Sequence, residues 1–113
     1  MREVKAIIQP FMLNKVVDAL MGIEGMPGVT VSEVRGFGKS RGADAAQKFV
    51  DSGIAYAIKT KLEVMVPDSM VSTVVDAIRQ AAYTGRPGDG KVFVIDIQES
   101  VKIRTGERDE DAL

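Results

Sequence analysis

The most constraining feature of this sequence is an internal repeat, because one pattern of strand, proline and helix occurs twice. The letters VVDA at residues 16–19 recur at residues 74–77. Each copy follows a short apolar run that ends in a proline, at residues 4–10 in the first half and 62–67 in the second. The repeat predicts two β-α-β units.

One helix is expected in each unit. The first spans residues 14–24 and is stopped by Gly25 and Pro27. The second begins at Asp68, a residue type that favours the N-cap position, and ends near Gly85. Apolar residues at helical spacing mark one face of each helix, and we interpret both faces as core. These residues are Leu13, Val16, Val17, Leu20 and Met21 in the first helix and Val71, Val74, Val75, Ile78 and Ala82 in the second.

Four strands are predicted, at residues 4–9, 29–36, 59–66 and 91–98. Two helices can cover only one face of such a sheet. In the last strand apolar residues nevertheless point to both faces, which predicts that the second face is buried against another subunit. One set consists of Val92 and Val94, and the other of Phe93, Ile95 and Ile97. A homo-oligomer is therefore expected.

Length and composition restrict the function. At 113 residues the chain is expected to form one domain, residues 1–113. It has no cysteine and no histidine, which excludes disulfides, thiolate chemistry, the common zinc sites and histidine as a general base. A net charge of −1 gives no electrostatic reason to bind nucleic acid, and the middle strands lack paired exposed aromatics for RNA. No apolar stretch approaches the roughly 20 residues of a membrane span and no signal peptide is visible, so a cytoplasmic protein is expected.

The segment between the second and third strands, residues 38–58, is too long for a hairpin turn and too rich in alanine and glycine for a strand. Part of it, residues 43–50, could form a helix. Long segments of this kind often carry binding, although an unstructured insertion is the alternative. Its apolar residues favour docking onto a partner protein. They are Phe49, Val50, Ile54 and Tyr56.

Three segments each combine a glycine-containing bend with a basic residue: residues 36–39, 88–91 and 102–107. Bare backbone amides and cations are the groups that hold phosphates, and the four cations could together neutralise a triphosphate. The cations are Lys39, Lys91, Lys102 and Arg104. Each segment alone is a weak signal, because Pro-Gly-Asp-Gly is often only a turn. Lys102 and Arg104 could likewise be a solvated face of an extended segment.

Together, residues 84–94, the Gly-Phe-Gly bend at 36–38, the tail at 103–107 and the opening at 6–11 resemble the PII nitrogen-regulatory signal proteins. The resemblance covers nearly the whole chain. It implies an α+β, ferredoxin-like β-α-β-β-α-β fold assembled as a homotrimer, with ATP and ADP bound in the clefts between subunits. It also implies that residues 38–58 are the family's T-loop, which docks a partner protein.

The resemblance assigns nucleotide-binding roles to named positions. Gly88, Asp89, Gly90 and Lys91 match the loop that cradles the phosphates, and Lys39, Lys102 and Arg104 match basic phosphate ligands. Gly36, Phe37 and Gly38 match the bend over the nucleotide, whereas Thr30, Glu63 and Val64 match residues around the adenine and ribose. For Glu63 the alternative is an exposed strand residue in a salt bridge with a neighbouring lysine.

The sequence also departs from the family pattern. Ser40 stands where many members have a glutamine that holds magnesium and helps bind 2-oxoglutarate, and Gln9 replaces a usual basic residue, while Lys59 is retained. A hydroxyl is a poorer ligand than an amide carbonyl for a hard cation, so 2-oxoglutarate sensing of the usual kind is not expected and magnesium stays an open question. Ser52 replaces the tyrosine that some relatives have uridylylated.

The leading hypothesis is a non-catalytic signal-transduction regulator that binds ATP and ADP and controls a partner through its T-loop, in a divergent branch whose partner is unknown and could be a membrane transporter. No catalytic or metal residues are assigned. One alternative is a nucleotide-hydrolysing enzyme that uses Asp89 and Glu63. Another is a trimeric ferredoxin-like binding module without a nucleotide. Residues 107–113 are expected to be an acidic, solvated tail.

Overall fold

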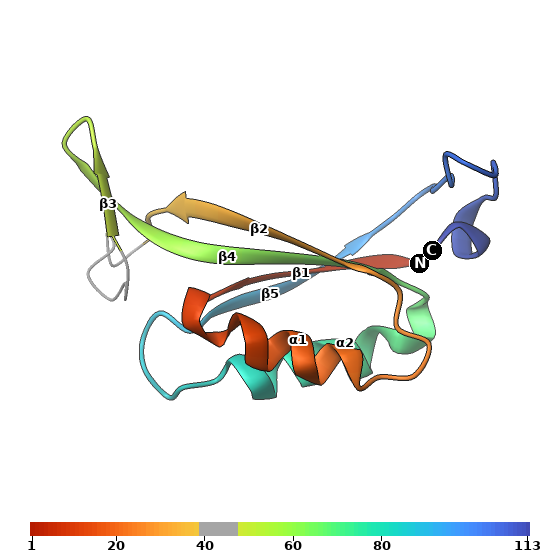
Figure 1. Ribbon diagram of the computed structural model, residues 1–113, viewed down its shortest axis with the longest axis horizontal. Coiled ribbons are helices and arrows are strands. Elements are labelled where there is room, and N and C mark those ends of the chain that lie inside the picture. The colour runs from red at the N-terminus through yellow and green to blue at the C-terminus, as the bar shows by residue number, and fades with distance from the viewer. Residues whose placement is uncertain (39–47) are drawn as a thin grey trace.

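A computed structural model describes residues 1–38 and 48–113 of the chain. Its centre is a sheet in the order β2-β4-β1-β5 (Figure 1). Strand β1 (Arg2–Ile8) pairs antiparallel with both β4 (Ile54–Val66) and β5 (Gly90–Asp96), and β2 (Val29–Gly36) pairs with β4 on its other side. The four predicted strands are confirmed, although β4 begins five residues before the predicted start at Lys59.

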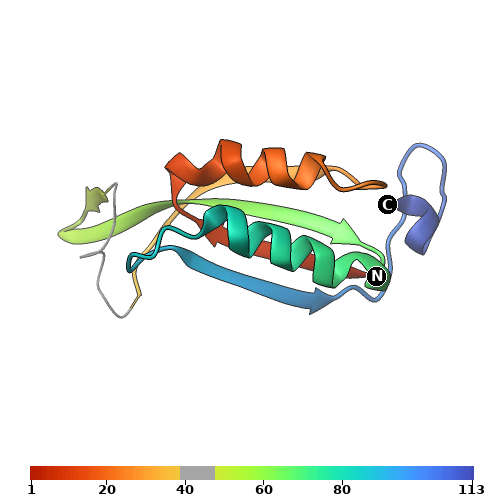
Figure 2. The ribbon, with the colours of Figure 1, turned by 90° about the horizontal axis from the view of Figure 1, so that it is seen from below.

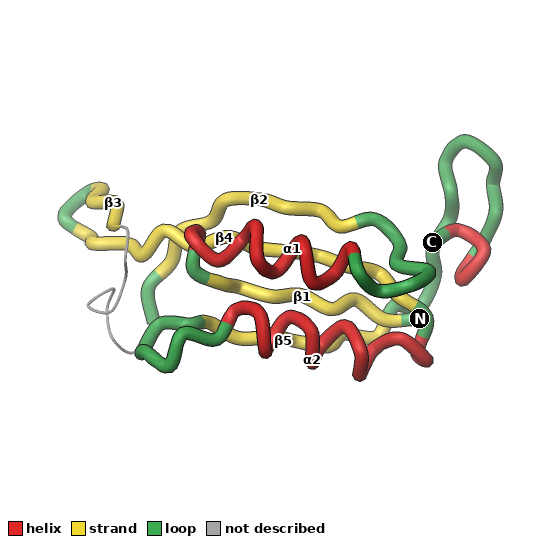
Figure 3. The backbone as a smooth tube through the Cα atoms, turned by 60° about the horizontal axis from the view of Figure 1, so that its bottom comes forward, coloured by secondary structure: helices red, strands yellow, loops and turns green. Residues whose placement is uncertain are grey.

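Two helices lie side by side on one face of this sheet (Figures 2 and 3). Helix α1 spans Leu13–Met21 and helix α2 spans Val71–Ala82, and a short 3-10 turn precedes each, at Pro10–Met12 and Asp68–Met70. Helix α1 ends three residues before the predicted limit at Glu24. The element order, apart from an additional short strand, is β-α-β-β-α-β, so the predicted α+β ferredoxin-like fold is confirmed.

The predicted N-cap role of Asp68 is wrong. No side-chain cap is formed at this helix start. Instead, the Asp68 carboxylate lies 2.9 Å from the N-terminal amine of Met1 and 3.5 Å from the Arg2 guanidinium. These cations lower the pKa of Asp68, chiefly through the hydrogen bond from the terminal amine. The N-terminus of the chain lies next to the start of this helix. Its charged amine and the Arg2 guanidinium attract the Asp68 carboxylate more strongly than the neutral backbone amides of the helix start do.

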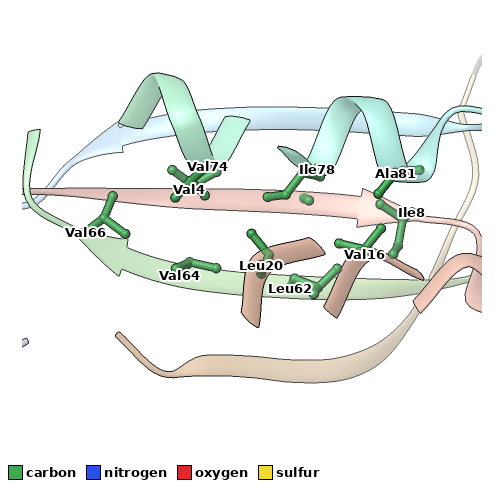
Figure 4. Close-up of a cluster of buried hydrophobic side chains, with 12 residues drawn as sticks. Val4, Ile8, Val16, Leu20, Leu62, Val64, Val66, Val74, Ile78 and Ala81 are labelled. Carbon is green, nitrogen blue, oxygen red and sulfur yellow. The ribbon is translucent and has the colours of Figure 1, made fainter. Parts of the chain in front are cut away.

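The core fills the space between the helices and the covered face of the sheet (Figure 4). Alternate residues of the central strands point into it, as the period of two predicts. Both VVDA repeats contribute their first valine, and each such side chain stabilises the fold by roughly 1.5–3 kcal/mol when fully buried. The fully buried side chains include Val4, Ile8, Val16, Leu20, Leu62, Val64, Val66, Val74 and Ile78.

Neither α1 nor α2 lies on the opposite face of the sheet (Figure 1). Phe93 and Ile95 of β5 lie there, 47% and 40% exposed. Beside them are two acids and two lysines of the central strands, whose side chains form ion pairs along each strand: Lys5–Glu3 at 3.8 Å and Lys61–Glu63 at 3.5 Å. We call this surface the open face. The apolar residues of β5 on this face agree with the alternation read from the sequence, and burial against another subunit stays a prediction.

Part of the long segment folds as a β-hairpin, which we call the hairpin arm, residues 48–57. Strand β3 (Lys48–Asp51) pairs with the start of β4, so that Asp51 faces Ile54 across the turn. The prediction that residues 38–58 are too rich in alanine and glycine for a strand is therefore wrong, and so is a helix at residues 48–50. The error arose because Ser52 and Gly53 both adopt positive φ and close a tight turn between two β-forming runs. Residues 43–47 lie outside the described part.

Candidate functional site

The loop between α2 and β5, residues 83–89, is organised by one carboxylate. Asp89 Oδ2 accepts hydrogen bonds from the backbone amides of Thr84, at 2.8 Å, and Gly85, at 3.2 Å. The hydroxyl of Thr84 donates to Asp89 Oδ1. These bonds lower the pKa of Asp89, with the Thr84 hydroxyl as the largest cause. Asp89 is therefore occupied in holding the loop closed.

Two further contacts tie this loop to the sheet. The Lys59 ammonium of β4 donates to the carbonyl oxygen of Gly88 at 2.5 Å. Gly90 begins β5 with φ +106°, and a Cβ atom added there would lie 1.7 Å from the carbonyl oxygen of Ile7. No residue other than glycine fits at this crossing of backbones. The glycine at position 90 thus has a structural cause that is independent of phosphate binding.

A groove of about 400 Å³ lies along α2 and β5, next to this loop. Its floor is largely apolar, and Lys91 and Arg79 bring cations to its lining. Neither cation forms an ion pair with another residue in the described ranges 1–38 and 48–113. The groove is lined by Ile8, Val75, Ile78, Arg79, Ala82, Tyr83, Asp89, Gly90, Lys91 and Val92. An unpaired ammonium beside a closed, glycine-containing loop is an arrangement that suits an anion.

The Gly-Phe-Gly bend, residues 36–38, begins with the last residue of β2 and lies at the same end of the sheet as this loop (Figure 1). Gly36 lies opposite Ala57 of β4. A Cβ atom at Gly36 or Gly38 would meet no neighbouring atom within 4 Å. Among the described residues, the two glycines of the bend therefore have open space beside their backbone. Lys39, the predicted cation that follows it, lies outside the described residues.

The residues predicted to surround the adenine and ribose occupy the middle of the sheet. Thr30 of β2 lies directly opposite Glu63 of β4. Glu63 forms the alternative that the sequence left open, an ion pair with Lys61 at 3.5 Å. The side chain of Val64 is fully buried in the core, so only its backbone could contact a ligand.

Glu63 also interacts with a second carboxyl group on the open face, that of Glu3. A hydrogen bond from Glu3 lowers the pKa of Glu63, whereas burial is the main cause that raises the pKa of Glu3. Glu3 Oε2 is shielded from solvent and accepts no hydrogen bond within the part of the chain that the structure describes.

Lys102 and Arg104 lie in a turn and not in the extended segment that the sequence suggested. The amide of Gly106 donates to the Lys102 carbonyl at 2.7 Å, and the amide of Lys102 donates to the Glu107 carbonyl at 2.8 Å. The Lys102 ammonium lies 4.0 Å from the Glu107 carboxylate. Ile103, between the two cations, is 100% exposed.

One chain brings together two of the three predicted segments. The bend at 36–38 and the loop at 88–91 lie at one end of the sheet, while the turn at 102–107 lies beyond the opposite end (Figure 1). The β5 ladder between Gly90 and Asp96 alone spans about 20 Å. Within one chain, the third segment therefore does not meet the first two.

Two contacts at this end could not be read from the sequence. The Arg35 guanidinium lies 4.1 Å from the centre of the Phe49 ring, and the rings of Phe37 and Tyr56 lie 6.0 Å apart. The alternation of Arg35 and Phe37 was the available signal, but their ring partners belong to a hairpin that was not predicted. Gln9 is buried, and its Oε1 accepts no hydrogen bond within the described ranges.

The fold and the arrangement of these loops define a small α+β protein of the ferredoxin-like type. A family model described as nitrogen regulatory protein P-II matches residues 1–107. Nitrogen regulatory protein P-II of Azospirillum brasilense is 43% identical over 113 residues, and P-II 1 of Escherichia coli K12 is 42% identical, each over the full length of both chains. A crystal structure of Arabidopsis thaliana PII bound to citrate superposes with a TM-score of 0.78 at 37% identity, covering 99% of this chain and 91% of that one.

The chain therefore belongs to the P-II family of nitrogen regulatory proteins, which are signalling regulators. The resemblance stated from the sequence is confirmed. Of the helices in the described part of the chain, none is long and apolar enough to cross a membrane. Within the same ranges, no three carboxylates gather into a group that could hold a metal ion.

Proposed function

We propose that this protein is a non-catalytic regulator that binds ATP and ADP between subunits of a homotrimer and controls a partner protein through the hairpin arm. The observation that carries the proposal is the closed loop at residues 84–90, which presents unpaired Lys91 beside bare backbone. Phosphate groups are recognised by a point charge beside a glycine-containing loop.

The separation of the predicted segments supports a site between subunits. Three copies packed head to tail around a rotation axis would bring the 102–107 turn of one copy to the loop and bend of the next. Lys102 and Arg104 would then complete the phosphate site, and the fully exposed Ile103 would gain a neighbour. The same assembly would cover the apolar residues of the open face.

The hairpin arm supports the partner-binding role. Val50 is 68% exposed at its tip, and Phe49 and Ile54 are also exposed. Apolar groups that stay exposed on a projecting element suit docking onto another protein. An enzymatic role is not favoured, because Asp89 is fully engaged by the Thr84–Gly85 backbone and Glu63 is paired with Lys61.

Isothermal titration calorimetry with ATP and ADP tests the nucleotide site. Replacing Lys91→Ala removes one charge-assisted contact and is expected to weaken ATP binding by roughly tenfold to a hundredfold. Lys15→Ala, at an exposed position of α1, is the matched control and should bind like the parent. Absence of nucleotide binding to the parent protein, or equal binding by Lys91→Ala, would refute the proposed site.

Light scattering tests the assembly. We expect a particle mass of three times the chain mass of 12.2 kDa. A particle of the chain mass at micromolar concentration would refute the trimer and, with it, the completion of the site by the 102–107 turn.

A further inference from the structure

The 102–107 turn is closed at its base by two pairs of residues, which we call the base clamp: Ser100 with Asp109, and Glu99 with Arg108. The backbone amide of Asp109 donates to the Ser100 carbonyl at 2.8 Å, and the Ser100 hydroxyl donates to the Asp109 carbonyl at 2.9 Å. The Ser100 amide also donates to Asp109 Oδ1, at 3.4 Å. The Arg108 guanidinium lies 2.8 Å from the Glu99 carboxylate. The base clamp therefore joins the two ends of the turn.

The turn above the base clamp has hydrogen bonds of its own. Besides the two backbone bonds described above, the Thr105 hydroxyl donates to the Glu107 carboxylate at 2.7 Å, and Gly106 adopts φ +75°. Residues 101–110 are exposed throughout. The shape of this part of the chain therefore depends on polar contacts and not on an apolar core. Ordering an exposed segment has an entropic cost that burial does not offset here.

We propose that Ser100 and Asp109 are positioning residues, which hold the 102–107 turn in a preformed shape so that Lys102 and Arg104 are presented together to the phosphates of a nucleotide. This inference rests on the proposed function, which brings the turn to the nucleotide site of the next subunit. A cationic side chain on a backbone that is already fixed loses less freedom on binding, so preformation strengthens phosphate binding without a new contact.

Asp109 is the residue on which the base clamp depends most. It has φ +55°, a conformation that a residue other than glycine rarely adopts. Aspartate and asparagine tolerate it best, because their short polar side chains can form local hydrogen bonds. Here the Asp109 amide, carbonyl and carboxylate each bond to Ser100. Alanine at this position would lose the carboxylate contact and disfavour the backbone conformation that the other two contacts need.

Amide hydrogen exchange measured by NMR without nucleotide tests whether the turn is preformed. The amides of Lys102 and Gly106 donate within the turn and should exchange slowly in the parent protein. Asp109→Ala is expected to speed the exchange of both amides. Asp109→Asn is the matched control, because it removes the same charge and keeps an acceptor oxygen and the tolerance of positive φ. It should exchange like the parent.

Calorimetry with ATP on the same proteins tests the consequence for binding. Asp109→Ala is expected to weaken ATP binding by roughly tenfold, the effect of having to order two long side chains during binding. Asp109→Asn should bind like the parent. Ser100→Ala loses only the hydroxyl contact and should show a smaller loss in the same direction. Light scattering should give the same particle mass for every variant.

A double-mutant cycle separates positioning from general damage to the fold. If Asp109 acts through the two cations, Asp109→Ala should cost clearly less ATP affinity in an Arg104→Ala protein than in the parent, because one of the side chains that it positions is already absent. A merely structural defect would weaken ATP binding by the same factor in both proteins.

The possible failures are distinguishable. Asp109→Ala with faster exchange at Gly106 and parental ATP affinity would overturn the positioning role and leave the proposed function standing. Unchanged exchange in Asp109→Ala, or an equal loss of affinity with and without Arg104, would have the same meaning. Absence of ATP binding to the parent protein would overturn the proposed function, and the positioning role with it.

Discussion

Replacing Gly90→Ala should destabilise the fold strongly, because two independent costs coincide at this position. The residue has φ +106°, where a side chain is strained, and the new Cβ would lie 1.7 Å from the carbonyl oxygen of Ile7. Backbone strain of this kind costs about 1–3 kcal/mol, and relieving a steric overlap in a packed region costs about 1–3 kcal/mol more. The expected loss in the free energy of unfolding is their sum, roughly 2–6 kcal/mol.

Two other glycines separate these costs. Gly25 has φ +74° and nothing within 4 Å of an added Cβ, so Gly25→Ala measures the backbone strain without the overlap. Gly28 has neither a positive φ nor a near neighbour, so Gly28→Ala serves as the neutral control. The expected order of stability is Gly28→Ala close to the parent, then Gly25→Ala, and then Gly90→Ala well below both.

Thermal unfolding followed by far-UV circular dichroism gives the measurement. For a chain of this length, 1 kcal/mol corresponds to about 4 °C in Tm. Protein concentration must be the same in every sample, because an oligomer gains apparent stability with concentration. If the Gly90→Ala and Gly25→Ala proteins melt within about 2 °C of each other, the close approach of Gly90 to Ile7 does not matter and the reasoning is wrong.

Three further predictions follow from other contacts. Asp89→Ala should lower Tm and weaken ATP binding together, because the loop loses the acceptor for Thr84 and Gly85; calorimetry that finds parental affinity would contradict this. Asp68→Asn should lower Tm near neutral pH, and the difference from the parent should vanish as acid protonates Asp68. The pKa of Asp68 is lower in the folded chain than in the unfolded chain. Its contribution to the free energy of unfolding is therefore fully present above the unfolded pKa of about 3.9 and is lost as pH falls through the folded pKa. A difference that persists at low pH would exclude the ion pair as the cause. Ile95→Lys on the open face should reduce the particle mass in light scattering while leaving the circular dichroism spectrum unchanged, and an unaltered mass would remove this face from the interface.

The sheet and both helices could be predicted because each depends on local pattern. Alternation in β1 and β4, helical spacing in α1 and α2, and the repeated proline each specify their element without reference to distant residues. The hairpin arm was missed because alanine and glycine lower strand propensity, whereas the arm is closed by a turn whose residues adopt positive φ. Tertiary pairing outweighed composition there.

In the candidate site, the sequence was sufficient to identify the loop, but it could not show which structural contact requires each residue of the loop. Gly90 is required by the carbonyl of Ile7, and Asp89 by the amides of its own loop. The close approach of Gly90 to Ile7 has no trace in the sequence, because the two residues are more than eighty positions apart along the chain. The separation of Lys102 and Arg104 from the loop is likewise a property of the sheet length.

The anchoring of the chain start has a practical consequence. The amide of Ile97 donates to the Met1 carbonyl, and the Ser100 hydroxyl lies 3.4 Å from the Met1 sulfur, so the chain start and the C-terminal segment meet at the end of the sheet away from the bend and the 84–90 loop. A fluorescent protein or affinity handle fused after Leu113 would stand far from that loop and leave the terminal amine in its ion pair with Asp68. The same handle placed before Met1 would replace the amine by an uncharged peptide bond and loosen the start of α2.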